Sequence, residues 1–196
     1  MKLYVSAGSG NAYKVRVLIS LLKLPCEQVI VDFASKEQKK PEFLKLNPRG
    51  EVPVIEDSGM VIWDSAACLV YIARKYGGEQ WLPGDPAGMA QVQQWLALAA
   101  TEIQIGLQYT RRGLKQGRWT AGNLEQGQAI GRVALATLEN RLKDHDWLAG
   151  NHPTIADIAC FAYVETAPDA NLPLEPYPGI VAWLSRCKAL PGWATR

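Results

Sequence analysis

The stretch of sequence that decides the fold is residues 47–65, which read NPRGEVPVIEDSGMVIWDS. Pro53 opens an apolar strand pattern there, where its missing N–H group would interrupt a sheet ladder. A cis Val52–Pro53 bond in a tight turn accounts for this, and it leaves the backbone of Val52 free to pair with an extended peptide. Asp64 and Ser65 then head a helical pattern, where a carboxylate, a hydroxyl and free N–H groups can hold one end of a small zwitterion. The stretch predicts a clamp for a short charged peptide.

Each part of this clamp also has a purely structural interpretation. A trans proline in an ordinary loop is by far the commoner state of an X–Pro bond. Asp64 or Ser65 can cap a helix without any ligand, although capping and binding are compatible. The position of Pro53 directly before an apolar strand favours the cis form.

Strand and helix patterns alternate through the first 80 residues. Apolar residues at helical spacing, such as Val15, Leu18 and Leu22, predict a helix over 11–22. The Asp57-Ser58-Gly59 turn between two apolar runs predicts a hairpin. The full pattern has strands at 2–5, 27–31, 54–56 and 60–63, and helices at 11–22, 41–46 and 64–76. This order, βαβ followed by ββα, is typical of a thioredoxin-like domain.

The second half of the sequence reads as helical only. Residues 82–86, Leu-Pro-Gly-Asp-Pro, have the composition of a linker, and no strand pattern follows them. Residues 154–157 form a capping box with Asp where Glu or Gln is commoner, and the apolar run behind it predicts a buried helix. Helices are expected over 87–109, 125–144, 154–166 and 177–189. We expect an α/β thioredoxin-like domain at 1–80, a linker at 81–86 and an all-α helical bundle domain at 87–196.

Composition excludes several classes of function. The net charge of +2, from 21 basic and 19 acidic residues, argues against nucleic acid or an anionic membrane as a partner. No apolar stretch approaches the roughly 20 residues needed to cross a bilayer. The four cysteines contain no C-x-x-C pair, and their spacing to the two histidines is not that of a metal site. The cysteines are Cys26, Cys68, Cys160 and Cys187, and the histidines are His145 and His152. We expect a reduced, cytoplasmic protein without a metal site.

Four segments, in this order, resemble those of a cytosolic glutathione transferase over essentially the whole chain. They are Ser9 to Arg16 after the first strand, Asn47 to Pro53, the Asp64-Ser65 pair and the box at 154–157. In detail the chain is similar to the bacterial relatives of the theta-type, serine-using enzymes. The resemblance implies glutathione as cosubstrate, a homodimer and a role in detoxification.

The resemblance also implies how glutathione would bind. Ser65 corresponds to the family residue that holds the γ-glutamyl carboxylate, at a helix start that favours an anion. Asp64 would face the ammonium group of the same end. Val52 would pair its backbone with the cysteinyl unit while cis Pro53 fixes the turn.

The glycine carboxylate of glutathione needs a cation or a hydrogen-bond donor. The matching positions in the family fall at Gln38 and Lys39, within a charged run that also reads as a solvated loop. Arg49 is a second candidate, with the alternatives that it braces the turn or pairs with Glu51.

The thiol of glutathione is the reacting group, and its pKa near ~8.5 leaves only a few per cent as thiolate at neutral pH. Ser9 lies in the loop before the first helix and matches the serine of theta-type relatives, whose hydroxyl donates to the sulfur. Asn11 carries an amide that can do the same. The alternative is that either residue merely caps the helix. The slot used by a nucleophilic cysteine in redox relatives holds no sulfur here.

The electrophile would bind beside the thiol against the helical half. Candidates on or just after the first long helix are Leu107, Tyr109, Arg111 and Arg112. We expect a glutathione S-transferase that joins the thiolate to a hydrophobic electrophile. The alternatives are a glutathione-dependent isomerase, dehalogenase or ether-cleaving enzyme, and a binding protein that keeps the fold without chemistry.

Overall fold

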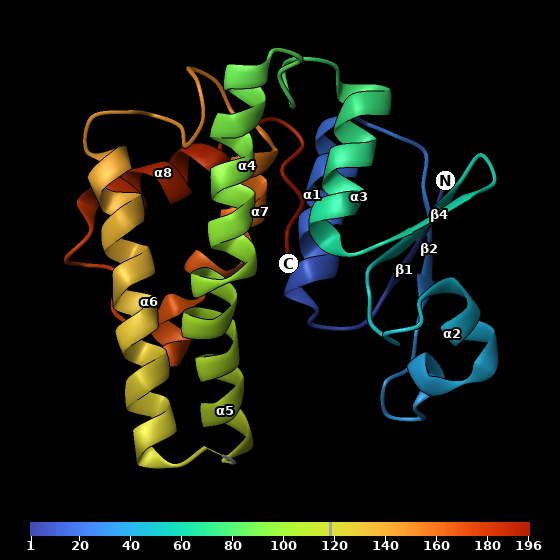
Figure 1. Cartoon of the computed structure of the whole chain (residues 1–196), viewed down its shortest axis with the longest axis horizontal. Helices are drawn as coiled ribbons and strands as arrows, with labels where there is room; N and C mark the ends of the chain where they lie inside the picture. The colour runs from blue at the N-terminus through green and yellow to red at the C-terminus, as the bar shows by residue number, and fades with distance from the viewer. Residues whose placement is uncertain (118) are drawn as a thin grey trace. The chain divides into compact units, whose positions relative to one another are not determined.

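The computed structural model describes residues 1–117 and 119–196, and these divide into two compact units (Figure 1). Unit 1 comprises Met1–Gly78 and Pro191–Arg196, and unit 2 comprises Glu79–Leu190. The sequence patterns leave residues 191–196 with the helical half, whereas the structure packs them on unit 1. Hydrogen bonds explain this, because the Tyr13 hydroxyl donates to the Ala194 carbonyl at 2.9 Å and accepts from the Trp193 indole at 3.1 Å.

Unit 1 has the βαβ–ββα order that the sequence predicts. Its strands form one sheet in the order β2-β1-β3-β4, with β1 and β2 parallel and the other pairs antiparallel. Ser58 and Gly59 both have positive φ, as a two-residue hairpin turn between β3 and β4 requires. The elements are β1 (Lys2–Val5), α1 (Gly10–Leu21), β2 (Glu27–Ile30), the 3₁₀ turn η1 (Glu37–Lys39), α2 (Pro41–Leu46), β3 (Val54–Asp57), β4 (Met60–Trp63), α3 (Ser65–Ile72) and the π-helical turn η2 (Ala73–Gly77).

The alternation of side chains along the strands gives the sheet two covered faces. Leu3 and Ile55 are buried on the face that carries α1 and α3, which lie side by side in Figure 1. On the opposite face, Tyr4 and Val54 pack with Phe43 of α2. The helices α1 and α3, whose first residues include the predicted site residues Asn11 and Ser65, therefore rest on the same side of the sheet.

A buried carboxylate, Asp57, ties the hairpin to the end of the helical segment α3–η2. Its Oδ2 accepts from Tyr76 at 2.6 Å, from Lys75 at 2.7 Å and from Tyr71 at 3.0 Å. Burial raises the pKa of Asp57, but these donors outweigh it and lower the pKa to about 2. Since the unfolded value is about 3.9, the network stabilises the fold above pH 4.

Among the described residues of unit 2, all regular secondary structure is helical. They are α4 (Pro86–Ala100), the π-helical turn η3 (Gln104–Tyr109), α5 (Thr110–Gln116), α6 (Ala121–Leu142), α7 (Ile155–Val164), the 3₁₀ turn η4 (Ala167–Ala170) and α8 (Pro178–Lys188). The sequence predicts one helix over 87–109, but the regular α-helix ends at Ala100, and α5 was not predicted. Within the described residues, no helix is long and apolar enough to cross a membrane.

Close packing explains the irregular turn η3. A Cβ atom on Gly106 would lie 2.3 Å from the backbone nitrogen of Gly131 in α6, so the two backbones touch without side chains between them.

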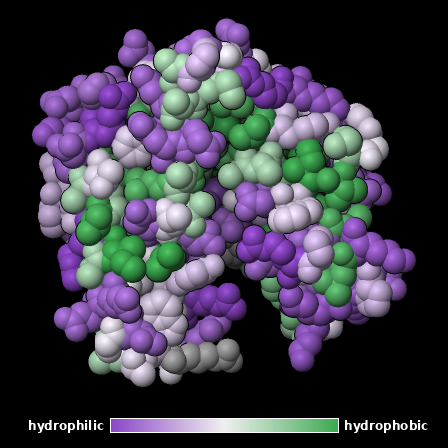
Figure 2. All heavy atoms as spheres, viewed as in Figure 1, coloured by the Kyte–Doolittle hydropathy of each residue, from purple (hydrophilic) through white to green (hydrophobic). Residues whose placement is uncertain are grey.

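Figure 2 shows purple hydrophilic residues over much of the visible face, as expected for a chain in which charged residues make up 20%.

The buried helix α7 is held by the capping box that the sequence predicts. All ten of its residues are buried, and Asp157 accepts from the backbone N–H of Thr154 at 2.9 Å. The same carboxylate accepts from the backbone of Leu148 at 3.1 Å and from the indole of Trp183 at 2.9 Å. One side chain thus joins the start of α7 to the preceding loop and to α8.

We predict that Asp57→Asn removes an acid-dependent part of the stability. The folded pKa is depressed, so the contribution is present above pH 4 and is lost as the pH falls from about 4 to about 2. The shift corresponds to about 2 kcal/mol. Urea unfolding of the wild type and the variant at several pH values measures this difference, which should close toward pH 2. Asp144→Asn, at an exposed position, is the control, and an equal effect of both variants would contradict the account.

We predict that Asp157→Ala lowers the free energy of unfolding by at least about 3 kcal/mol, because buried donors of three residues lose their acceptor. Asp169→Ala, in the same unit, removes a partly exposed partner of Arg111 and Lys115 and should cost less than about 1 kcal/mol. Chemical denaturation of both variants tests this. A loss below about 1 kcal/mol for Asp157→Ala would show that the network is dispensable.

Candidate functional site

The loop at 47–53 is fixed by the buried side chain of Asn47, which is 2% exposed. Its Nδ2 donates to the Glu51 carbonyl at 2.8 Å, and its Oδ1 accepts from the Arg49 N–H at 3.0 Å. Gly50 has a φ of +63°, and a Cβ there would lie 2.5 Å from the carbonyl oxygen of Gln38. The loop therefore has one tightly specified conformation, which ends in the cis Val52–Pro53 bond that the sequence predicts.

The start of α3 forms a second fixed element. Asp64 has a φ of 78°, and its Oδ1 accepts from the backbone N–H groups of Ala66 at 2.9 Å and Ala67 at 3.3 Å. The capping interpretation of Asp64 is thus confirmed. Ser65 is 7% exposed, and its hydroxyl donates to Oδ1 of Asn11 at 3.3 Å. This bond brings the N-termini of α1 and α3 together, and both ends favour negative charge.

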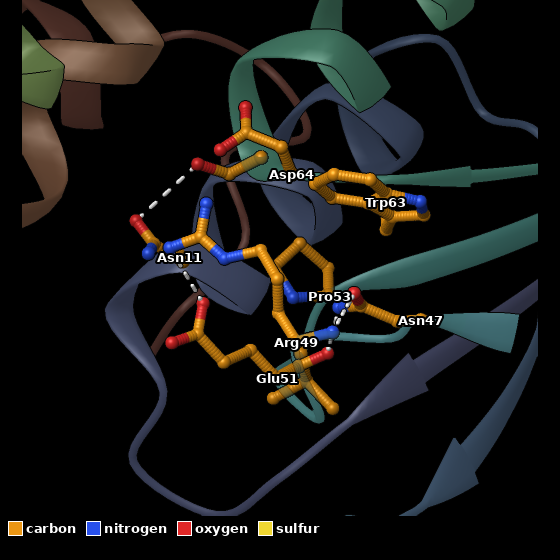
Figure 3. Close-up of a pocket in the computed structure, with 9 residues that line it drawn as sticks. Asn11, Asn47, Arg49, Glu51, Pro53, Trp63 and Asp64 are labelled. Atoms are coloured by element: carbon orange, nitrogen blue, oxygen red, sulfur yellow. Dashed lines mark hydrogen bonds and ion pairs between the residues drawn. The ribbon is translucent and has the colours of Figure 1, made fainter. Parts of the chain in front are cut away.

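A small pocket lies where these elements meet (Figure 3). Three of its lining residues carry charge, namely Arg49, Glu51 and Asp64, and the Arg49 guanidinium lies 3.2 Å from the Glu51 carboxylate. Figure 3 shows these two side chains extending from the loop toward Asn11. The full lining is Asn11, Asn47, Arg49, Glu51, Val52, Pro53, Trp63, Asp64 and Ser65.

The structure brings together five of the eight residues predicted to hold or activate glutathione. These five are Asn11, Val52, Pro53, Asp64 and Ser65, and the lining also contains Arg49, the second candidate for the glycine carboxylate. Gln38 and Lys39 are not in the lining; they lie on η1 behind the loop, where the Lys39 ammonium donates to the Arg49 carbonyl at 2.9 Å. Sequence reasoning did not assign Asn47, Glu51 or Trp63 to the site. The only feature of the sequence that could have indicated these three residues is their position within the stretch 47–65.

Ser9, two residues before Asn11, is not part of the pocket lining. It is the N-cap of α1, with its Oγ accepting from the backbone N–H of Ala12 at 3.2 Å. A hydroxyl that accepts one bond still has a proton to donate, so capping leaves Ser9 able to serve an anion.

The four residues proposed for the electrophile have different surroundings within unit 2. Leu107 is 1% exposed and belongs to the core. The Tyr109 hydroxyl accepts from the Gln104 amide at 3.0 Å. Arg111 donates to Asp169 at 2.8 Å, whereas Arg112 is exposed. Both arginines lie in α5, not on a continuation of α4.

Three of the four thiols of this chain are poorly suited to act as nucleophiles. Burial raises the pKa of Cys68 to about 12 and also raises the pKa of Cys26 and Cys187. Among residues 1–117 and 119–196, no group of three or more His, Cys, Asp or Glu side chains is placed to hold a metal ion.

Family models match both halves of the chain. The glutathione S-transferase N-terminal domain matches residues 1–74, and the C-terminal domain of the same family matches residues 124–191. An Anopheles gambiae protein named glutathione S-transferase D7 is 33% identical over 189 residues, which cover 95% of this chain and 85% of the relative. The chain belongs to the glutathione S-transferase family.

Solved structures of glutathione S-transferases agree with this membership. The crystal structure of a glutathione S-transferase from Pseudomonas fluorescens Pf-5 matches with a TM-score of 0.92 and 33% identity, covering 99% of this chain and 97% of the other. A glutathione transferase homologue from Drosophila mojavensis, solved with bound glutathione, matches with a TM-score of 0.87 and 27% identity over 97% of this chain and 88% of the other. The family fold thus extends through both units.

We predict that Asn47→Ala loosens the loop at 47–53 and lowers the free energy of unfolding by about 1–3 kcal/mol, since the Glu51 carbonyl and the Arg49 N–H lose their partner. Hydrogen exchange at the Arg49 amide should accelerate. Asn151→Ala, at an exposed position, is the control. Unchanged exchange at Arg49 would show that the loop does not depend on Asn47.

Proposed function

We propose that this chain is a glutathione transferase that joins the sulfur of glutathione to an electrophilic carbon of a hydrophobic molecule. In the reaction the thiol loses its proton, a carbon–sulfur bond forms, and the displaced bond electrons leave with a leaving group or stay on the acceptor. The observation that carries the proposal is the meeting of two helix N-termini, joined by the Ser65–Asn11 hydrogen bond, beside the cis Val52–Pro53 turn.

The proposed binding mode follows the charges around the pocket. The hydroxyl and backbone N–H of Ser65, at the positive end of α3, would hold the γ-glutamyl carboxylate, and Asp64 would face the ammonium group. Val52 would pair its backbone with the cysteinyl unit, as an added strand does. The glycine end then points toward Arg49, with Gln38 and Lys39 behind it on η1.

Thiolate stabilisation is the proposed source of activation. Ser9 would donate its hydroxyl proton to the sulfur, with the Asn11 amide as a second donor, and the positive end of α1 would add to both. Each unit by which the thiol pKa falls corresponds to about 1.4 kcal/mol of preference for the thiolate. The raised pKa values of Cys26, Cys68 and Cys187 support glutathione, and not a protein thiol, as the nucleophile.

The finer assignment that we propose is the serine-type, theta-like subtype of bacterial relatives. It is supported by the position of Ser9 before α1 and by the likeness to the Pseudomonas fluorescens structure. With this subtype we propose a homodimer in the cytoplasm that acts in detoxification. For the electrophile, Tyr109 and Arg112 are the candidates with exposed side chains, while Leu107 and Arg111 would act by shaping the helical unit.

The test is a pH titration of the glutathione complex, followed by the ultraviolet absorbance of the thiolate. We expect a bound-thiol pKa at least about one unit below ~8.5 in the wild type. Ser9→Ala should raise it by about one unit and lower conjugation below pH 7 about tenfold, and Asn11→Ala should act in the same direction to a smaller extent.

Thr120→Ala is the matched control, because Thr120 caps α6 as Ser9 caps α1 and is not among the residues proposed to hold or activate glutathione. An undisturbed thiol pKa in the wild type would overturn the transferase proposal. Equal pKa values for the wild type and Ser9→Ala would reduce Ser9 to a helix cap.

A further inference from the structure

The pocket carries a surplus of negative charge for a site that is to hold a peptide with two carboxylates. Glu51 and Asp64 line it together with a single cation, Arg49. The nearby Lys39 ammonium lies outside the lining and donates to the Arg49 carbonyl at 2.9 Å. In the proposed binding mode Asp64 is matched by the ammonium group of the peptide. Glu51 is already paired with Arg49 at 3.2 Å, so the lining keeps no unpaired cation for the second carboxylate of the peptide.

The position of Glu51 is fixed by the loop, while its carboxylate remains accessible. Its carbonyl accepts from the buried Asn47 amide at 2.8 Å, so the backbone that carries the side chain cannot easily move away from the pocket. The side chains of Arg49 and Glu51 are 55% and 59% exposed, and their charged groups lie 3.2 Å apart. A ligand in the pocket therefore meets both charges at once.

Chain direction assigns this pair to one end of the ligand. If the γ-glutamyl end lies at Ser65 and the middle residue pairs with Val52, the far end of the peptide reaches the residues that precede Val52 in the loop, Glu51 and Arg49. This step rests on the proposed function. A free carboxylate there accepts from Arg49 but faces the like charge of Glu51, and it competes with Glu51 for the same guanidinium.

A primary amide fits the same two groups without that conflict. Its carbonyl oxygen accepts from the Arg49 guanidinium, and its NH₂ group donates to the Glu51 carboxylate, so the ion pair stays intact. We propose that the Arg49–Glu51 pair reads the far end of the thiol peptide and makes this site prefer a peptide with an uncharged, amide-type C-terminus over one with a free carboxylate. Glu51 is thus a specificity-determining residue.

The experiment compares calorimetric binding of glutathione and of glutathione amidated at its glycine carboxyl, at low salt. The wild type should bind the amide about two- to fivefold more tightly, the range expected for one exposed charge interaction. Glu51→Gln should bind free glutathione about two- to fivefold more tightly than the wild type does and should lose the discrimination. The preference should shrink as salt is added.

Glu42→Gln is the matched control, because it removes the same charge from an exposed position of α2 outside the pocket and should change neither affinity. A wild type that prefers the free acid, or a Glu51→Gln variant that keeps the wild-type ratio, overturns the specificity proposal and leaves the transferase proposal intact. Failure of the wild type to bind either peptide overturns both.

Discussion

The hydrogen bond from the Ser65 hydroxyl to the Asn11 amide connects the two helix starts on which the site depends. The first N–H groups of a helix have no partner within the helix and need an acceptor from elsewhere. Ser9 and Asp64 supply part of this need as caps for α1 and α3. The remaining donors and the positive helix ends create the local preference for an anion that the proposed chemistry uses.

Buried carboxylates hold each of the two units in its folded form. Asp57 fixes the hairpin that follows the cis turn, and the hairpin in turn leads directly into Asp64 and α3. In unit 2, Asp157 joins α7 to α8 and to the loop before it. In both cases one carboxylate satisfies several donors, which is what makes its burial favourable. Within unit 1, the position of Asp64 at the start of α3 thus depends on the polar contacts of Asp57, which lies outside the pocket lining.

Much of unit 1 could be predicted from local signals. The hairpin turn at Ser58-Gly59, the cis Val52–Pro53 bond and the helix cap at Asp64 were each predicted from neighbouring residues, and the structure has them. The end of regular α4 could not be predicted, because it depends on the contact between Gly106 and Gly131, which are far apart in the sequence. The packing of residues 191–196 on Tyr13 is also a long-range contact.

The site was predictable as a stretch of sequence but not as a set of contacts. Asp64 and Ser65 follow from the signature of a helix start, whereas Glu51 in the pocket lining depends on how Asn47 folds the loop. The placement of Gln38 and Lys39 behind this loop depends on the close approach of Gly50 to η1. The periodicity of apolar residues and the spacing of motifs do not indicate such contacts, because these contacts form only once the chain has folded.

The most direct test of the account is a nuclear magnetic resonance titration of the protein with glutathione, read at individual amide groups. The account predicts that the backbone N–H signals of Val52 and Ser65 and the side-chain NH₂ signals of Asn11 shift together, with one common dissociation constant, while the signals of Asp57 and Asp157 stay in place. Shifts confined to other regions, or no shifts at all, would contradict the proposal that this pocket holds glutathione.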